Sequence, residues 1–98
     1  MKDLVHQLNK AFENRIRLGI MSALMVNDSL SFNRIKELLG VTDGNLASHL
    51  RALEKLEYVK MEKQFIDRKS HTTYQCSKLG RKAFQEHLKA LENLINQK

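Results

Sequence analysis

The sequence predicts a small, mainly α-helical domain with one β-hairpin. Apolar residues recur at helical spacing along most of the chain, and a stretch near residue 60 changes to a period of two. The chain also contains no proline and only four glycines, which favours helices with short connections. Ninety-eight residues suffice for one modest core, so we expect residues 1–98 to form a single domain.

The N-terminal quarter has the spacing of an amphipathic helix. Apolar residues follow a helical period through residues 4–12 and again through residues 16–25. Asn14 lies between the two series and can cap a fresh helix, so the region is one bent helix or two. The polar stretch at residues 27–29 ends it.

A short helix is expected next. Ser31 or Asn33 can begin it, and Gly40 supplies a C-terminal stop. The residues expected to face inward are Ile35, Leu38 and Leu39.

The following stretch, "GVTDGNLASHLRALEKLEYV", predicts a helix from about Thr42 to Leu56, with Thr42 and Asp43 as capping candidates. Projection at about 100° per residue places Leu46, Leu50 and Leu53 on one core stripe, with His49 on its flank. The opposite face is small and polar near the helix start and basic further along. Its members are Gly44, Asn45, Ser48, Arg51, Ala52 and Lys55.

Two strands joined by a basic loop are predicted after this helix. Residues 58–66 alternate apolar and polar side chains, and residues 71–76 are rich in strand formers. The turn between them, Asp67–Ser70, carries Arg68 and Lys69. Ser77 then resembles the N-cap of a long final helix that runs through Ile95.

The net charge of +6 and the pI near 9.7 favour a polyanionic partner. A single cysteine, Cys76, excludes an internal disulfide and indicates a reducing compartment. We expect a cytoplasmic protein that has no contact with membranes, because the start of the chain does not have the pattern of a signal peptide and its longest apolar run is Ala23–Val26.

The small, polar start of the helix at residues 42–56 suits a DNA major groove. Short hydroxyl and amide side chains let the backbone approach closely, asparagine pairs with adenine and arginine with guanine. Asp43 would repel phosphate, so we assign it mainly to capping. An ordinary capped helix with a solvated face remains the alternative for this stretch taken alone.

Three segments in order carry a resemblance to a known family: "TDGNLASHL", "DRKSHTTY" and "SKLGRKAF". From about Asn14 to Leu94 the chain resembles the winged-helix transcriptional regulators, and is most similar to the small stand-alone group near the MarR and ArsR families. The resemblance implies a winged helix-turn-helix that binds double-stranded DNA, with a recognition helix at about 42–56 in the major groove. It also implies a wing at about 66–71 on the minor groove or on phosphate.

Carried over position by position, the resemblance implies that the DNA-binding residues are Thr42, Gly44, Asn45, Ser48, His49 and Arg51 on the helix and Arg68 and Lys69 on the wing. The helical projection adds Lys55, on the same outward face, to this set. His49 can equally be a half-buried histidine on the flank of the core. Arg15 and Arg17, in the preceding helix, either contact phosphate or are solvated.

The terminal helices predict a homodimer. Their apolar stripes exceed the needs of so small a core, and related regulators dimerise through these helices. Closure of the monomer's own core is the alternative. The residues concerned are Leu4, Val5, Leu8, Phe12, Phe84, Leu88, Leu91 and Ile95.

We expect no metal and no cofactor, because Cys76 has no partner thiol and the four histidines form no i, i+4 pair. Neither a small-molecule effector nor a redox role for Cys76 can be read from the sequence. Without a nucleophile–base pair or a phosphate loop, an enzyme is not expected. A winged helix that binds protein or RNA is the alternative function.

Overall fold

The structure, a computed structural model, describes residues 1–97. The elements, in chain order, are α1 (Lys2–His6), the 3-10 turn η1 (Lys10–Phe12), α2 (Arg15–Met25), β1 (Leu30–Ser31), α3 (Phe32–Leu39), α4 (Asp43–Lys55), β2 (Val59–Ile66), β3 (Lys69–Cys76) and α5 (Lys78–Ile95). The strands form an antiparallel sheet in the order β1-β3-β2. The predicted fold class, mainly α with a small hairpin, is therefore confirmed.

Asparagines interrupt the N-terminal region, which forms three short pieces instead of one or two helices. The side chain of Asn9 accepts a hydrogen bond from the Ala11 N–H and begins η1. The side chain of Asn14 accepts from the Ile16 and Arg17 N–H groups and begins α2, as predicted. Amide caps stabilise helix starts by satisfying N–H groups that have no partner within the helix.

One cluster of buried side chains lies between α2, α3, α4, the base of the sheet and α5. The three leucines of the predicted α4 stripe are all within it. The prediction for Leu38 is wrong, because that side chain is 47% exposed. The predictions for Ile35 and Leu39 are confirmed, because both face the core and the Leu39 side chain lies over Gly19 of α2.

The sheet is larger than predicted. Leu30 and Ser31 form a short strand that pairs with Tyr74 and Thr73 of β3, and this strand was not predicted from the sequence. The hairpin turn is also tighter than predicted: Lys69 already pairs with Ile66, and the turn consists of Asp67 and Arg68. Both turn residues have positive φ, which is characteristic of a two-residue hairpin turn whose twist matches that of the strands.

Ser77 joins the end of α4 to the start of α5. Its hydroxyl donates to the Glu57 carbonyl at 2.6 Å and accepts from the Gly80 N–H at 2.9 Å, as predicted for an N-cap. Its own N–H donates to the Tyr58 carbonyl. Gly80 is buried directly against this carbonyl, so the two segments touch through their backbones.

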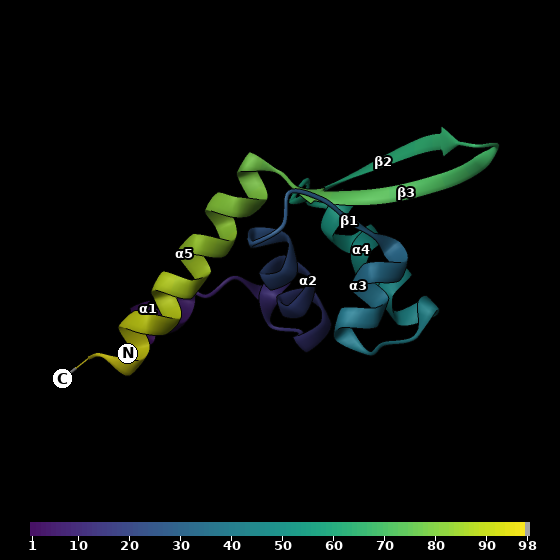
Figure 1. Cartoon of the computed structure of the whole chain (residues 1–98). Coiled ribbons are helices and arrows are strands. Elements are labelled where there is room, and N and C mark those ends of the chain that lie inside the picture. The colour runs from purple at the N-terminus through teal and green to yellow at the C-terminus, as the bar shows by residue number, and fades with distance from the viewer. Residues whose placement is uncertain (98) are drawn as a thin grey trace.

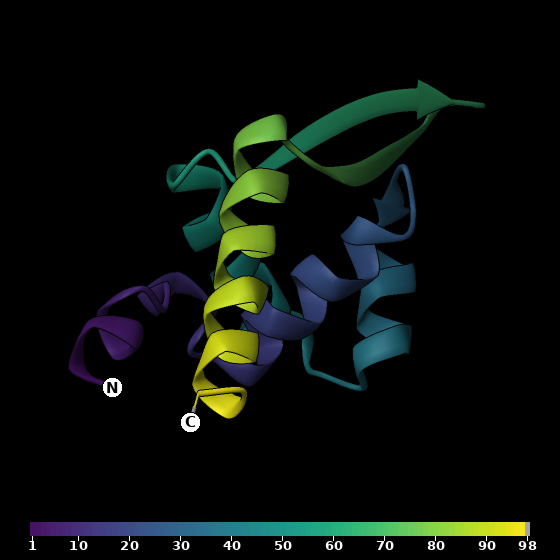
Figure 2. The ribbon, with the colours of Figure 1, turned by 90° about the vertical axis from the view of Figure 1, so that its left-hand side faces the viewer.

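The molecule is elongated, with a longest dimension of 58 Å. α5 and α1 extend toward one end, and the β2–β3 hairpin projects toward the other, past α3 and α4 (Figure 1). Turning the molecule by 90° shows that α5 crosses in front of the helical cluster, and that both termini lie near the C-terminal end of α5 (Figure 2). Within residues 1–97, no helix combines the length and apolar character needed to cross a bilayer.

The terminal stripes divide between the core and the surface. Phe12 and Phe84 are buried in the monomer and pack edge to face, so their assignment to a dimer surface is wrong. Helix α1 lies along α5, and Leu4 and Leu8 are partly covered. The apolar side chains that remain exposed on these helices are Val5, Leu79, Leu88, Leu91 and Ile95.

His87 fastens the N-terminal segment to α5. It is 4% exposed, and its Nδ1 accepts a hydrogen bond from the Asn9 N–H at 3.0 Å. The Asn9 side chain continues the connection to the Tyr58 hydroxyl. Burial lowers the pKa of His87, and nearby Glu13 offsets part of this shift.

We therefore expect mild acid to destabilise the protein. Because the pKa of His87 is lower in the folded chain than its ordinary value near 6.5, the unfolded chain takes up the proton first. The stability that the neutral His87 side chain contributes is fully present above the ordinary pKa of histidine. This stability is lost as the pH falls through the lower pKa of His87 in the folded chain. The free energy of unfolding, measured with urea at pH 7.5 and at pH 5, should differ less between the two pH values for His87→Gln than for the unmodified protein.

The matched control is His71→Gln, which changes an exposed histidine on β3. If the free energy of unfolding changed between the two pH values by the same amount in His87→Gln as in the unmodified protein, the prediction would be contradicted.

Candidate nucleic-acid interface

Thr42 caps α4, and Asp43 does not. The Thr42 hydroxyl accepts a hydrogen bond from the Asn45 N–H at 3.2 Å. Asp43 instead forms a salt bridge of 2.8 Å with Lys36 of α3. The assignment of Asp43 to capping is therefore wrong, because an ammonium group is available to it across the turn between the two helices. Lys36 also neutralises the carboxylate that would repel a phosphate at this end.

The outer face of α4 has the predicted composition. The side chains at its start are small, exposed and able to form hydrogen bonds, and exposed cations follow one and two turns later. These residues are Thr42, Gly44, Asn45, Ser48, Arg51 and Lys55. A Cβ added to Gly44 would meet no atom within 4 Å, so neither packing nor backbone conformation requires glycine there.

His49 differs from the other predicted residues. It is half-buried on the flank of α4, and its Nδ1 accepts a hydrogen bond of 3.0 Å from the Arg17 Nε. Burial and the adjacent guanidinium both hold the pKa of His49 below its ordinary value. The neutral ring therefore carries its proton on Nε2, while Arg17 is fixed beside α4.

The hairpin tip carries cations, although not both in the turn. Arg68 is a turn residue with a φ of 65°, and Lys69 is the first residue of β3. Both are exposed. Lys63 lies on β2 opposite Thr72 and adds a third exposed cation to the outer hairpin.

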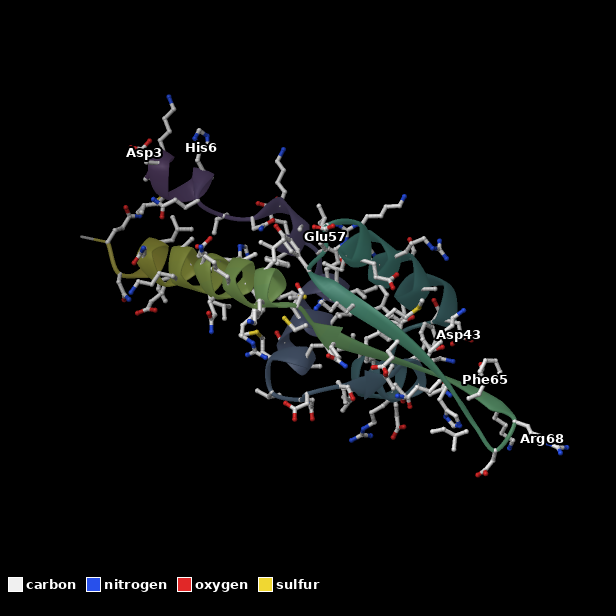
Figure 3. The ribbon with its side chains drawn as sticks, turned by 90° about the horizontal axis from the view of Figure 1, so that it is seen from above. Asp3, His6, Asp43, Glu57, Phe65 and Arg68 are labelled. Carbon is white, nitrogen blue, oxygen red and sulfur yellow. The ribbon has the colours of Figure 1, made fainter. Side chains whose placement is uncertain are left out.

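The α4 start and the hairpin tip lie at the same end of the molecule. Seen from above, Asp43, Phe65 and Arg68 are grouped at one end, and Asp3 and His6 are at the other (Figure 3). Figure 1 agrees, because the hairpin projects over the side on which α4 begins. A helix start that can form hydrogen bonds and a cationic tip can therefore contact one extended partner together.

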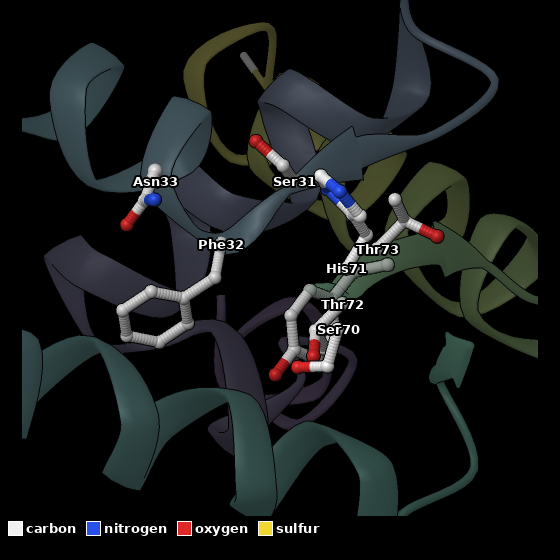
Figure 4. A pocket seen from close by; sticks show the side chains of 8 residues that line it. Ser31, Phe32, Asn33, Ser70, His71, Thr72 and Thr73 are labelled. Atoms are coloured by element: carbon white, nitrogen blue, oxygen red, sulfur yellow. The ribbon is translucent and has the colours of Figure 1, made fainter. Parts of the chain in front are cut away.

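A polar cavity of about 340 Å³ separates the start of α3 from the outer half of β3 (Figure 4). It is lined by Ser31, Phe32, Asn33 and residues 70–74, and it is partly open to solvent. These residues offer hydroxyls, an amide and an imidazole, and none of them carries a carboxylate or a thiol. The lining is suited to hydrogen bonding.

Comparison with known proteins identifies the family. A family model described as a winged helix DNA-binding domain matches residues 16–95. The chain belongs to the winged helix DNA-binding domain family. In this winged helix, α3 and α4 form the helix-turn-helix, β2 and β3 form the wing, and α4 is the recognition helix of the motif.

Relatives share almost the whole of this winged helix. A transcriptional regulator homologue from Pyrococcus horikoshii is 32% identical, with a TM-score of 0.89 over 98% of this chain and 96% of its own. The uncharacterized protein MJ0432 of Methanocaldococcus jannaschii is 34% identical over 81% of this chain and 86% of its own. MepR of S. aureus, solved as a DNA complex, is 17% identical with a TM-score of 0.77 over 98% and 79% of the two chains, and so shares the fold. The likeness to winged-helix transcriptional regulators is confirmed.

Cys76 is a half-buried residue at the base of the wing. Its thiol donates to the Ser77 carbonyl, and burial raises its pKa, with nearby Arg81 offsetting part of the shift. Within residues 1–97, no three histidine, cysteine or acidic side chains are grouped to hold a metal ion.

Proposed function

We propose that this winged helix is a sequence-specific, double-stranded DNA-binding transcriptional regulator. The observation that carries the proposal is the exposed, lightly built start of α4, open around Gly44, at the same end as the cationic wing. The P. horikoshii relative is described as a transcriptional regulator homologue, and MepR was solved with DNA. We also propose that the protein is cytoplasmic.

In this proposal, α4 enters the major groove by its N-terminal half. Asn45, Ser48 and Arg51 reach base edges, since amide, hydroxyl and guanidinium groups recognise bases there. Thr42 and Gly44 allow close approach, and Lys55 contacts phosphate. His49 contributes its remaining N–H at the edge of the same surface. Arg68 and Lys69 contact the neighbouring minor groove or its phosphates.

We further propose a homodimer formed through the terminal helices. Leu88, Leu91 and Ile95 are exposed along α5 and would be covered by a second copy. A two-fold axis there would present two α4 helices to successive major grooves, about 34 Å apart.

We propose a binding role without catalysis, because the titratable side chains that line the polar cavity beside the wing are one histidine and one tyrosine, with no carboxylate or thiol beside them. A winged helix that binds protein or RNA would be favoured if the outer face of α4 proved dispensable for duplex binding. No observation on residues 1–97 favours that function over DNA.

Selection of bound duplexes from a random pool, at near-physiological salt, tests the proposal. We expect a two-fold symmetric consensus with half-sites about one helical turn apart. A pool that shows no enrichment, although the protein is folded, would contradict DNA-binding regulation. An enriched but unsymmetric site would retain DNA binding and contradict the dimer.

We expect Arg68→Asn to weaken binding to the selected site and to random duplex by the same factor. Asparagine tolerates the positive φ of this turn, so the substitution removes charge without straining the hairpin. The slope of log affinity against log salt should fall by about one for each phosphate that the wing no longer neutralises.

Lys89→Gln, an exposed substitution on α5, is the matched control for charge. If it lowered the salt slope as much as Arg68→Asn, net charge and not the wing would be responsible.

A further inference from the structure

The wing exposes apolar side chains at positions where they do not pack against the core. Phe65 is 80% exposed and Ile66 is 49% exposed, although both precede the turn directly. Val59, at the other end of β2, is the buried residue of that strand. Phe65 lies opposite Ser70, whose small side chain offers its ring little to pack against. Folding therefore does not explain a phenylalanine at this position.

The outer hairpin extends well beyond the core. Tyr74 is the outermost buried residue of β3 and pairs with Met61. Ser31 of β1 still pairs with Thr73, which lies opposite Glu62, and four residue steps separate that pair from Ile66–Lys69, which corresponds to about 13 Å of two-stranded ribbon. A minor groove about 6 Å wide is narrower than a two-stranded ribbon with its side chains, but it can receive a single side chain from the tip. The hairpin thus carries its apolar residues beyond the sheet, to a place where one of them can enter a groove.

The apolar residues are surrounded by positive charge. Lys63 lies two residues before Phe65 on the same face, and Arg68 and Lys69 follow Ile66. The carboxylates of the outer hairpin are Asp67, in the turn, and Glu62, which alternates with Lys63 and so lies on the opposite face of β2 from Phe65. Neither of the two salt bridges formed within residues 1–97 involves these groups. Such a surface suits a partner with negative charges on its outside and apolar faces inside. A DNA duplex is such a partner, because its phosphates surround the stacked bases.

We propose that Phe65 is an apolar wedge that enters the minor groove beside a base step, partly unstacks it and bends the operator away from the wing. Proteins that insert Phe, Leu, Ile or Met at a base step kink DNA in this way. Ile66 contacts the sugars at the rim, and Arg68 and Lys69 hold the flanking phosphates. This inference rests on the proposed function, because the α4 start at the same end supplies the groove-binding partner of the wing.

The wedge has a consequence for the operator. Pyrimidine–purine steps unstack most easily, whereas A-tracts are stiff. The site should therefore contain a TA or CA step under the wing, at a position that no side chain needs to read by hydrogen bonding.

The test uses the full chain and the site selected from the random pool, with 2-aminopurine at the step under the wing and a fluorophore at each end. We expect binding to raise the 2-aminopurine fluorescence and the energy transfer between the ends. Phe65→Ala should abolish both changes and lower affinity roughly tenfold, the usual effect of removing one base–aromatic stacking interaction. Phe65→Trp should retain them, and an A-tract at the step should weaken binding of the unmodified protein but not of Phe65→Ala.

Val26→Ala is the matched control, because Val26 is also 80% exposed but lies at the end of α2. If Phe65→Ala binds and bends the site as the unmodified protein does, while Arg68→Asn loses affinity, the wedge is wrong and the proposed function stands. If the unmodified protein binds no duplex, the proposed function fails. Loss of binding to phosphatidylserine vesicles in Phe65→Ala, with DNA binding unchanged, would assign the patch to a membrane and overturn the wedge.

Discussion

Replacing Gly80 with alanine is expected to lower the free energy of unfolding by about 3 kcal/mol or more, at the upper end of effects seen when a core is overpacked. The added Cβ would overlap the Tyr58 carbonyl oxygen and lie 2.8 Å from its carbon. This carbonyl cannot move aside easily, since it accepts the Ser77 N–H, and the Tyr58 N–H donates to Leu53. A small domain has only about 5–15 kcal/mol of stability in total.

Urea unfolding followed by circular dichroism measures this loss. Gly44→Ala is the matched control: the same methyl group at an open position of α4 should leave stability unchanged or raise it by about 0.5–1 kcal/mol, because alanine favours a helix. If Gly80→Ala unfolded at the same urea concentration as Gly44→Ala, the result would contradict the close contact between α5 and Tyr58.

The second large effect concerns DNA and leaves the fold intact. Gly44→Leu should weaken binding to the selected site by about 2–4 kcal/mol, because a side chain that holds α4 away from the groove removes more than one base contact. The free energy of unfolding should not fall, since the added atoms would point into open space. Fluorescence anisotropy at fixed salt gives the affinity, and urea unfolding gives the stability.

Gln85→Leu adds the same side chain to an exposed position of α5 and should leave affinity unchanged. Retention of full affinity by Gly44→Leu, with a normal salt slope, would place the groove contact elsewhere on the chain and contradict the assignment of α4.

Local chemistry made much of this fold predictable. Hydroxyl and amide caps act within three residues of themselves, so Asn14, Thr42 and Ser77 could be assigned from the sequence. The leucine stripe of α4 follows from helical spacing alone. The contacts of the α4 face and wing with DNA stay predictions, although every one of these side chains except that of His49 is exposed.

Contacts between distant residues were not predictable. β1 exists because Leu30 meets Tyr74, far along the chain, and its two residues carry no strand pattern of their own. The Lys36–Asp43 and Arg17–His49 contacts depend on how the helices are placed relative to one another. The tight turn was missed because Asp-Arg lacks the glycine that usually marks such turns.

The contacts of Ser77 and Gly80 hold the end of the recognition helix rigidly against the start of the final helix. At 1.5 Å per residue, the 18 residues of α5 form a lever arm of about 27 Å. In a dimer held together by this arm, a tilt of about 5° between the two copies would move each recognition helix by about 2 Å. The half-site spacing that the regulator tolerates would then be set at the dimer axis, remote from the bases it distinguishes.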